Sequence, residues 1–522
     1  MGRRRKHWGW GYEDQQPSAA DLRGAMPLVR ERLGFDAQEP EEAVALEAAA
    51  VPAAGALPRA PAGVAWEVSS HARARHAWGG SYLDVVRGLR GRFDHAPDAV
   101  ARPGGEAQVA AVLEWASEHG VAVIPYGGGT SVVGGVTPAV DGPAVSLDLG
   151  ALDRVLEVDP VSRSARIQAG ALGPQLERQL AEHGVTLRCF PQSFELSTLG
   201  GWIATRAGGH FATGPTHIDD LVEAVRAITP SGVWASRRLP ASGAGPSPDR
   251  ALLGSEGILG VITEAWVRVQ PPPAARAARV VRFGSFAQGA EAVRAVVQSV
   301  LRPANCRLLD PSEAAFTRAR DGRSALLMLA FESVDAPRPG HELRRALELC
   351  AQAGGEWDEE DGRGAAGAWR DAFLQAPYLR DVLVALGVLS ETFETAITWE
   401  RFGALHAAVT AAARAALDDA RALVTCRFTH VYTDGPAAYF TVLAPARRGD
   451  EEGQWWAVKR ACSEALLEVG ATITHHHAVG RDHRPWYDRQ RPEPFAMTLA
   501  AAKAAVDPAG ILNPGVLVDP LV

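Results

Sequence analysis

Residues 121–135 read VAVIPYGGGTSVVGG, and this stretch decides the fold. Its apolar start is typical of a buried strand, and the strand passes directly into the three glycines 127–129. Because glycine has no Cβ, backbone N–H groups in such a loop can approach an anion closely, and the hydroxyls of Thr130 and Ser131 add donors. The stretch therefore predicts a strand followed by a loop that holds a pyrophosphate, although a glycine run alone is also a common turn.

Two later segments favour a cofactor loop over a simple turn. Residues 192–209 read QSFELSTLGGWIATRAGG, and residues 254–263 read GSEGILGVIT. Both are rich in small and hydroxyl side chains and lie between predicted strands, where a backbone can follow a long cofactor. The sequence has neither a GxxxxGK[ST] motif nor a GxGxxG motif that opens a helix, which disfavours a P-loop and a Rossmann fold.

Together the three segments resemble the FAD-binding domain (PCMH type) of the vanillyl-alcohol oxidase superfamily, over about residues 95–272. The resemblance implies that the first loop holds the pyrophosphate of an extended FAD and that the others approach its adenine side and its isoalloxazine. Covalent members attach the flavin through a histidine in or near the first loop. Since residues 121–135 contain no histidine, we expect non-covalent FAD. The implied cofactor-binding residues are Pro125, Tyr126, Gly127, Gly128, Gly129, Thr130, Ser131, Gln192, Ser193, Ser197, Thr198, Gly201, Thr205, Arg206, Ala207, Gly208, Glu256, Gly257, Gly260, Val261 and Ile262.

Outside these loops the chain reads as alternating strands and helices. Residues 107–120 show helical spacing and end in a glycine, and three prolines at 271–273 mark a domain boundary. We predict further helices at residues 19–35 and 41–51, and strands at 143–152, 154–160 and 164–172. The expected fold class is α/β (α+β), with a two-subdomain FAD-binding domain, a substrate (cap) domain and helical ends. The expected parts are an N-terminal helical segment at 1–90, the FAD-binding domain at 91–272, the substrate domain at 273–470, and a C-terminal segment at 471–522 that packs back on the flavin domain.

The composition bounds the class of protein. The 522 residues carry a net charge of −8, with 47% hydrophobic and 22% charged residues, which is typical of a soluble globular protein of two or three domains. The negative charge argues against nucleic acid as a partner. The five cysteines show no CxxC spacing, which predicts neither a structural zinc site nor disulfides and suits a reducing cytoplasm. We expect no signal peptide and no apolar run long enough to span a bilayer.

A run of three histidines, His475, His476 and His477, lies near the C-terminus with apolar residues on both sides. We predict that it ends a strand at an active site, because adjacent imidazoles offer several proton carriers and hydrogen-bond donors. In a strand the middle histidine would face away from its two neighbours, so we expect no metal site. The alternative is a solvated histidine run.

Further segments are similar to one branch of the superfamily, the alkyldihydroxyacetonephosphate synthase family, over most of the chain. They are HWGWGY at 7–12, CRLLD at 306–310, LSETFETAITWERF at 389–402, CRFTHVYTDGPAAYF at 426–440 and DPAGILNP at 507–514. The resemblance implies that Tyr439 is the active-site tyrosine and that Arg380 binds substrate. It also implies that Arg307 and the three histidines are catalytic.

The chemistry of this family fits these residue types. Its members exchange the acyl group of acyl-dihydroxyacetone phosphate for a long-chain alcohol, without net oxidation or reduction. Tyr439 would move a proton from the carbon that bears the ester oxygen. Since a tyrosine has a pKa of about 10, it needs nearby positive charge, which arginine or protonated histidine can provide. Arg307 and Arg380 offer planar donors for a phosphate and for the leaving carboxylate.

Each of these residues has a structural alternative. Tyr439 can be a core tyrosine on a strand, which would leave Tyr432 as the catalytic candidate. Arg380 can instead pair only with Asp381 or with a neighbouring helix, and Arg307 can pair with Asp310.

The function also has alternatives. The first is an FAD-dependent oxidoreductase of 2-hydroxyacids, similar to glycolate or D-lactate dehydrogenase, whose relatives often place a metal near the flavin through separated histidines. The contiguous histidine run speaks for the transferase. The second is a flavin-binding protein without catalysis, which the full set of polar candidates disfavours.

The expected partners are acyl-dihydroxyacetone phosphate and a long-chain alcohol. The sequence does not end in a peroxisomal Ser-Lys-Leu, and its arginine- and alanine-rich composition looks bacterial, so the chain lengths of both substrates stay open. We expect a cytoplasmic homodimer that associates with the inner face of the membrane. Trp455 and Trp456, followed by Lys459 and Arg460, are the candidate docking segment, unless they begin a buried helix.

Overall fold

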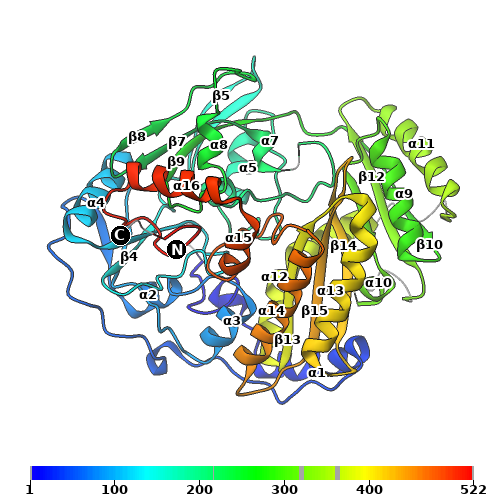
Figure 1. Cartoon of the computed structure of the whole chain (residues 1–522), viewed down its shortest axis with the longest axis horizontal. Helices are drawn as coiled ribbons and strands as arrows, with labels where there is room; N and C mark the ends of the chain where they lie inside the picture. Colours follow the sequence, from blue (N-terminus) through cyan, green and yellow to red (C-terminus); the bar gives the residue numbers. More distant parts are fainter. Residues whose placement is uncertain (1–2, 216, 317–321, 359–364, 520–522) are drawn as a thin grey trace.

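The computed structural model describes residues 3–215, 217–316, 322–358 and 365–519. Its strands form three sheets of four, five and six strands. Figure 1 shows them in two lobes, with the first two sheets and the C-terminal helices in one lobe and the six-stranded sheet in the other. The glycine loops belong to the first lobe, and the histidine run lies between the two.

The four-stranded sheet carries the first glycine loop. Its order is β1 (Ala65–Glu67), β2 (Ala99–Arg102), β4 (Ala144–Asp148) and β3 (Ala122–Tyr126), with β2, β4 and β3 parallel. Helix α4 (Glu106–His119) buries its apolar stripe against this sheet and ends at Gly120 in the left-handed conformation, φ 63°. The predicted helix and the predicted strand before the loop are therefore confirmed.

The five-stranded sheet presents the second and third loops. Its antiparallel order is β5 (Val155–Asp159), β6 (Ser164–Gln168), β9 (Val261–Arg268), β7 (Val222–Thr229) and β8 (Gly232–Ala235). The second loop runs into α6 (Leu199–Thr205), and the third runs into β9. The other helices of this part are α5 (Gly173–Ala181), α7 (Ile218–Leu221) and α8 (Pro248–Leu252).

The six-stranded antiparallel sheet forms the second lobe. Its order is β10 (Ala275–Phe283), β12 (Ala325–Ser333), β11 (Asn305–Leu309), β14 (Leu423–Val431), β15 (Pro436–Pro445) and β13 (Val388–Ala396). Successive side chains of a strand face opposite sides, and here Phe428 and Phe440 pack under helices while Arg427 and Tyr439 face the pocket described below. The helices of this lobe are α9 (Phe286–Gln298), α10 (Pro311–Phe316), α11 (Arg338–Gln352), α12 (Ala365–Ala385), α13 (Phe402–Leu417) and α14 (Glu451–Glu468).

The N-terminal segment is less helical than predicted. It contains α1 (Ala19–Leu33), which confirms one predicted helix, and the short α2 (Ser70–Arg75) and α3 (Tyr82–Leu89). The predicted helix at residues 41–51 is wrong, because only a 3-10 turn, Leu46–Ala48, forms there. The alanine-rich stretch instead runs extended between α12 and α3: Glu41 N–H donates to Ala385 O at 2.9 Å, and Val44 N–H donates to Leu89 O at 2.9 Å.

The C-terminal segment packs on the first lobe. It contains α15 (Arg484–Gln490) and α16 (Glu493–Val506), and Leu512 then forms a bridge with Val123 of β3. Asn513 donates its side-chain N–H to the backbone oxygens of Gly135 and Glu256. Both acceptors belong to glycine loops, so the end of the chain braces the loops from behind.

Of the tryptophan pair that was a candidate membrane anchor, Trp455 lies in the core and Trp456 is half-buried against it. Trp455 is 1% exposed and donates its indole N–H to Glu391 at 2.6 Å, and Lys459 pairs with the same carboxylate. The alternative, a buried helix start, is therefore the correct interpretation of this segment. Among the residues that the structure describes, no helix is both long and apolar enough to cross a bilayer.

Candidate active site

One pocket lies between the two lobes, and its floor is the polar face of the six-stranded sheet. The strand register places Glu394 of β13 opposite Tyr439 of β15, and Tyr439 opposite Arg427 of β14. One row across three strands thus carries a carboxylate, a phenol and a guanidinium. Thr392 and Thr441 form the next row and also line the pocket.

Arginines give this floor its positive charge. The Arg427 guanidinium lies over the ring of Tyr439, 3.9 Å from the ring centroid, and is also paired with the buried carboxylate of Glu313. Arg307 is fully buried in the pocket wall and donates to His210 O at 3.0 Å. Burial and the neighbouring Arg427 lower the pKa of Arg307 to about 9, which still leaves it charged at neutral pH.

Arg380 reaches the pocket from α12. It donates to Gly80 O at 2.7 Å and to the Thr392 hydroxyl at 2.9 Å, and so it does not depend on its neighbour Asp381. Asp381 instead pairs with Lys6 at 2.5 Å, with both side chains buried. Asp310, the other candidate partner for an arginine, accepts the backbone N–H groups of two residues nearby in the fold.

An N-terminal strap, residues 6–12, closes one side of the pocket. Trp10 lines the pocket and donates its indole N–H to Gly80 O, the same oxygen that Arg380 contacts. The backbone N–H of Trp10 donates to Asp381 at 2.9 Å. The strap therefore holds α12, and with it the guanidinium of Arg380, at the pocket.

The histidine run is a loop, and the prediction of a strand is wrong. The buried carboxylate of Glu394 accepts the backbone N–H groups of His475, His476 and His477 at 2.5, 3.0 and 2.7 Å. It also accepts the hydroxyl of Thr474 at 2.6 Å. Three consecutive N–H groups can point at one anion only when the backbone curls around it, so this carboxylate determines the loop conformation.

The imidazoles of this loop are neutral at physiological pH. Burial lowers the pKa of His475 and of His476 to about 3, and that of His477 to about 4. Burial alone would raise the pKa of Glu394, but the surrounding imidazoles and the Thr474 hydroxyl hold it well below its usual value. Of the two expected sources of positive charge beside Tyr439, arginine or protonated histidine, the structure places an arginine, Arg427, over the ring.

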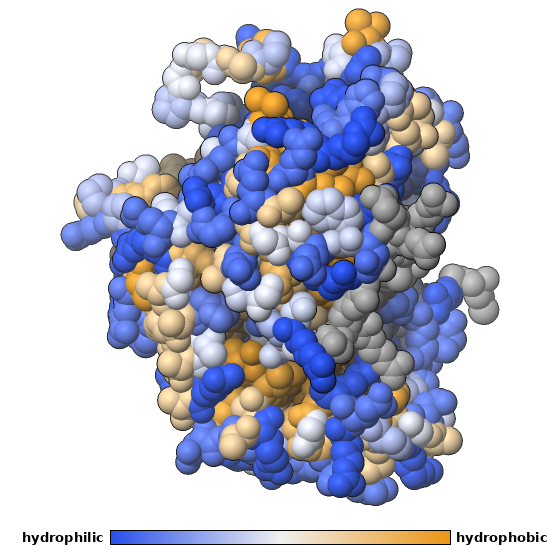
Figure 2. Space-filling view, turned by 90° about the vertical axis from the view of Figure 1, so that its right-hand side faces the viewer, coloured by the Kyte–Doolittle hydropathy of each residue, from blue (hydrophilic) through white to orange (hydrophobic). Residues whose placement is uncertain are grey.

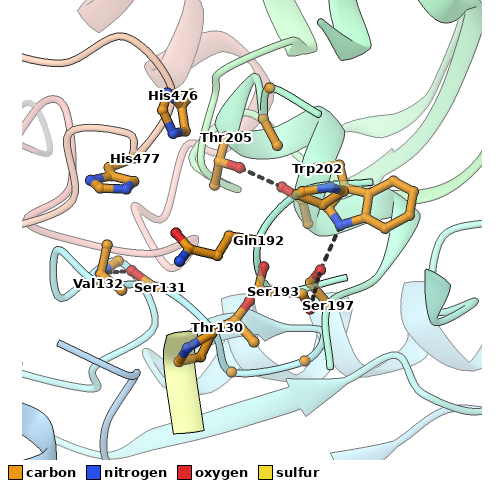
Figure 3. A pocket seen from close by; sticks show the side chains of 18 of the residues that line it. Thr130, Ser131, Val132, Gln192, Ser193, Ser197, Trp202, Thr205, His476 and His477 are labelled. Carbon is orange, nitrogen blue, oxygen red and sulfur yellow. Dashed lines mark hydrogen bonds between the residues drawn. The ribbon is translucent and has the colours of Figure 1, made fainter. Parts of the chain in front are cut away.

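The glycine loops meet at the opposite wall, where their geometry fits an extended cofactor. A Cβ on Gly127 would lie 2.3 Å from the Thr198 hydroxyl oxygen, and one on Gly128 would lie 1.7 Å from Leu196 O. The two loops thus touch backbone to backbone, and the pocket runs along them. Figure 3 shows Thr130, Ser131, Gln192 and Ser193 of these loops facing His476 and His477 across the pocket.

Glu256 joins the third loop to the histidine loop. Its carboxylate accepts the backbone N–H groups of Val479 and Gly480 at 2.9 and 2.8 Å. Burial raises the pKa of Glu256 to about 7. Glu256 therefore fixes two polar walls of the pocket, the glycine loops and the histidine loop, directly to each other.

Most of the predicted site residues line this one pocket. Three do not: Arg206 pairs with Asp219, Val261 is a core residue of β9, and His475 turns to Tyr432, whose hydroxyl lies 2.8 Å from its Nε2. The predicted residues that line it are Pro125, Tyr126, Gly127, Gly128, Gly129, Thr130, Ser131, Gln192, Ser193, Ser197, Thr198, Gly201, Thr205, Ala207, Gly208, Glu256, Gly257, Gly260, Ile262, Arg307, Arg380, Tyr439, His476 and His477.

The two candidate catalytic tyrosines differ in whether they line the pocket. Tyr439 lines the pocket, whereas Tyr432 contacts the far side of the histidine loop, and burial raises its pKa. The geometry therefore favours Tyr439 as the tyrosine that meets a substrate.

The sequence interpretation missed four residues of the site: Trp10, Glu394, Arg427 and His430. All four lie inside segments that had already been singled out, HWGWGY, LSETFETAITWERF and CRFTHVYTDGPAAYF. The alternation of side chains along the two strands of the last segment could have revealed Arg427. In the register that the strands adopt, Arg427 lies opposite Tyr439, and directly opposite residues share a face of the sheet.

Comparison with known protein families identifies the class of protein from its two domains. A model of the FAD binding domain matches residues 97–236, and a model of the C-terminal domain of FAD linked oxidases matches residues 272–517. The fold and the pocket are thus those of an FAD-linked oxidase-type flavoprotein, which confirms the predicted fold class and FAD as the cofactor.

The particular family follows from whole-chain similarity. The chain is 30% identical over 477 residues to alkyldihydroxyacetonephosphate synthase of Dictyostelium discoideum, which covers 86% of this chain and 77% of that protein. A solved structure of alkyldihydroxyacetonephosphate synthase superposes with a TM-score of 0.81 at 25% identity, over 98% of both chains. The chain belongs to the alkyldihydroxyacetonephosphate synthase family.

The similarity to oxidoreductases is weaker. The chain is 27% identical over 439 residues to the glycolate oxidase subunit GlcD of Bacillus subtilis, covering 81% of this chain and 89% of that protein. The 2-hydroxyacid oxidoreductase is therefore the less supported alternative.

We expect the purified protein to be yellow and to release intact FAD when it is denatured by acid or heat. The physical reason is that the first glycine loop, residues 121–135, offers no histidine for a covalent bond. Absorbance of the supernatant after precipitation, with mass spectrometry of the released flavin, checks this prediction. Flavin that remains in the washed polypeptide pellet, when a control with added free FAD leaves none there, would contradict it.

Proposed function

We propose that this protein exchanges the acyl group of acyl-dihydroxyacetone phosphate for a long-chain alcohol, a step of ether-lipid synthesis. The observation that carries the proposal is the composition of one pocket. Three arginines and Tyr439 line it, and the wall opposite its floor is formed by the glycine loops of an FAD-binding domain. Two anionic groups, the phosphate and the leaving carboxylate, require such a concentration of guanidinium groups.

The exchange leaves the oxidation state unchanged. The bond between the dihydroxyacetone carbon and the ester oxygen breaks, and the alcohol oxygen bonds to the same carbon. The proton of the alcohol leaves with the carboxylic acid, so atoms and electrons balance without an electron acceptor. FAD, when bound, supplies an electrophilic ring system beside the substrate.

Tyr439 carries the proton of the reacting carbon in this proposal. That carbon is acidic because it adjoins a ketone, and a phenolate beside it can accept its proton. The Arg427 guanidinium lies over the ring of Tyr439 and places a positive charge beside the reacting groups. The tyrosine is 4% exposed, so bulk water is largely kept away from this step.

Arg307 and Arg380 bind the anionic ends of the substrate in this proposal. They come from different elements, β11 and α12, and reach the same pocket, so that one can hold the phosphate while the other meets the carboxylate. The neutral imidazoles of His476 and His477 complete the polar wall as hydrogen-bond donors.

The long chains need an apolar path, and α12 offers one. Ala376, Pro377, Leu379 and Leu383 of this helix line the pocket, and Leu379 is 39% exposed at the surface. Figure 2 shows apolar surface on the face of the second lobe, gathered low in the view between hydrophilic residues. These features support peripheral association with a membrane, and we further propose that the protein works on its cytoplasmic face. Liposome flotation with Leu379→Glu against wild type tests the docking.

We propose in addition that the protein forms a homodimer, and the mass measured by light scattering of the purified protein tests this.

Exchange of palmitoyl-dihydroxyacetone phosphate with hexadecanol under strict anaerobiosis tests the proposed function. We expect free palmitate and the hexadecyl ether by mass spectrometry, with many turnovers and no dye or oxygen, because no electrons leave the substrates. Glycolate and D-lactate serve as the comparison substrates. Absolute dependence on an electron acceptor, with a 2-hydroxyacid as the better substrate, would falsify the exchange and favour the oxidoreductase.

A further inference from the structure

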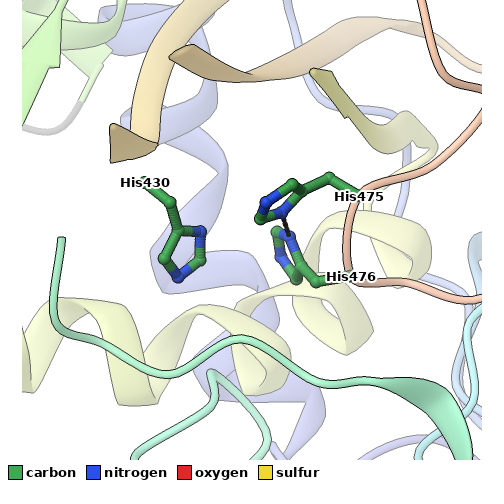
Figure 4. Close-up of side chains that lie close together, drawn as sticks. All are labelled: His430, His475 and His476. Carbon is green, nitrogen blue, oxygen red and sulfur yellow. Dashed lines mark hydrogen bonds between the residues drawn. The ribbon is translucent and has the colours of Figure 1, made fainter. Parts of the chain in front are cut away.

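Three imidazoles meet where the end of β14 approaches the histidine loop. His430 comes from β14, and His475 and His476 come from the loop (Figure 4). One ring nitrogen from each of the three lies within 4.8 Å of the other two. The Nδ1 atoms of His475 and His476 are only 3.1 Å apart. Adjacent residues of a strand could not converge in this way, so the loop conformation removes the reason for expecting no metal here.

His430 is oriented as a ligand. Its Nε2 lies 2.8 Å from Gly209 O, and because a carbonyl can only accept, Nε2 carries the proton and Nδ1 carries a lone pair. His430 is 2% exposed, and its Nδ1 is buried without a hydrogen-bond partner among the residues that the structure describes. A buried acceptor without a partner is costly, and a bound cation would satisfy it.

His475 also has one ring nitrogen with an outer partner and the other facing the cluster. Its Nε2 is held by the Tyr432 hydroxyl at 2.8 Å, which leaves Nδ1 facing His476. Histidines that bind metals almost always fix their second ring nitrogen with an outer hydrogen-bond partner. The separation of 3.1 Å is close to the roughly 3.3 Å between two ligand nitrogens placed tetrahedrally about 2.0–2.1 Å from a zinc ion.

We propose that His430, His475 and His476 bind a divalent transition-metal ion, with zinc as the reference ion. Three neutral imidazoles suit zinc, cobalt, nickel or copper rather than magnesium or calcium, which prefer oxygen. Glu394, His476 and His477 form a second possible set, but the Glu394 carboxylate already accepts three backbone N–H groups.

The site would be open on one side. His430 and His476 line the substrate pocket, so a fourth coordination position faces the space where a ligand enters. Three protein ligands and one open position are typical of a metal that meets a small anion or an oxygen of a substrate. The proposal does not rest on the proposed exchange reaction, since metal binding can be measured without substrate.

Zinc binding to the FAD-loaded protein tests the site. After chelation and dialysis, we expect isothermal titration with Zn²⁺ to give one tight site per chain, and Co²⁺ to give the visible absorption of a tetrahedral complex. His430→Ala should weaken zinc binding at least tenfold, and so should Tyr432→Phe, which leaves all three ligands in place and removes an outer partner. His119→Ala, an exposed histidine at the end of α4, is the matched control and should bind as wild type does.

The FAD content and melting temperature of each variant show whether it is folded. If His430→Ala does not fold, the Tyr432→Phe titration and the cobalt spectrum of the wild type decide. Absence of tight zinc binding in the wild-type protein would overturn the proposal. Equal affinity in wild type, Tyr432→Phe and folded His430→Ala would overturn it as well, because the zinc would then be bound elsewhere.

Discussion

Replacing Tyr439 with phenylalanine is expected to lower the turnover number of acyl exchange at least about a hundredfold, the usual contribution of a positioned proton-transfer group. The substitution removes only the phenolic oxygen, so the ring can still fill its place beneath Arg427. FAD content, melting temperature and the circular dichroism spectrum should therefore stay those of the wild type. Single-turnover release of fatty acid from the acyl substrate measures the loss directly.

Tyr432→Phe is the matched control for this prediction. The same atom is removed seven positions earlier in the chain, from a residue that contacts His475 and does not line the pocket. We expect it to retain exchange within a few-fold of wild type. Near-normal turnover in Tyr439→Phe together with an inactive Tyr432→Phe would transfer the proton-carrying role to Tyr432.

The Gly128→Ala variant is expected to lose its flavin. The added Cβ would lie 1.7 Å from Leu196 O and 2.9 Å from Ser197 Cα, and both are backbone atoms that cannot turn aside. The first and second glycine loops would have to separate. If the strain is about 2 kcal/mol, within the range for overpacked sites, FAD affinity falls roughly thirtyfold. Fluorescence titration of the apoprotein with FAD measures this change.

Gly403→Ala is the control for the flavin prediction. Gly403 lies in the first turn of α13, and a Cβ there would meet no atom within 4 Å. Because alanine favours a helix more than glycine does, we expect an unchanged FAD content and a stability equal to wild type or up to about 1 kcal/mol higher. Full flavin occupancy in Gly128→Ala would show that the loops do not need their close approach.

The parts of the site that could be predicted from sequence are those whose chemistry is local. A glycine loop after an apolar strand can be recognised from its own residues, because its backbone N–H groups can bind an anion wherever the strand lies in the fold. The helix at 106–119 and its terminal Gly120 are equally local. Arg427 was missed because its role depends on the register of β14 against β15, which no single segment specifies.

The histidine loop shows the opposite case, in which a local pattern misleads. Flanking apolar residues favoured a strand for residues 475–477, but Glu394 lies about eighty positions earlier and binds their three backbone N–H groups. A single buried carboxylate overrides the local preference, because each of these hydrogen bonds to a charged group contributes about 1.5–3 kcal/mol. Spacing within the run could not reveal a partner so far away.

The contacts of the N-terminal strap constrain the order in which the chain can fold during its synthesis. Lys6 leaves the ribosome early, yet its partner Asp381 lies 375 residues further along, which at about 5–20 residues per second means a wait of roughly 20–75 s. The two sheets of the first lobe, which end with β9 at Arg268, are made during that interval, whereas its C-terminal helices follow later. The first residues to be made are therefore among the last to pack, and a nascent chain contains Arg380 only when translation is about three-quarters complete.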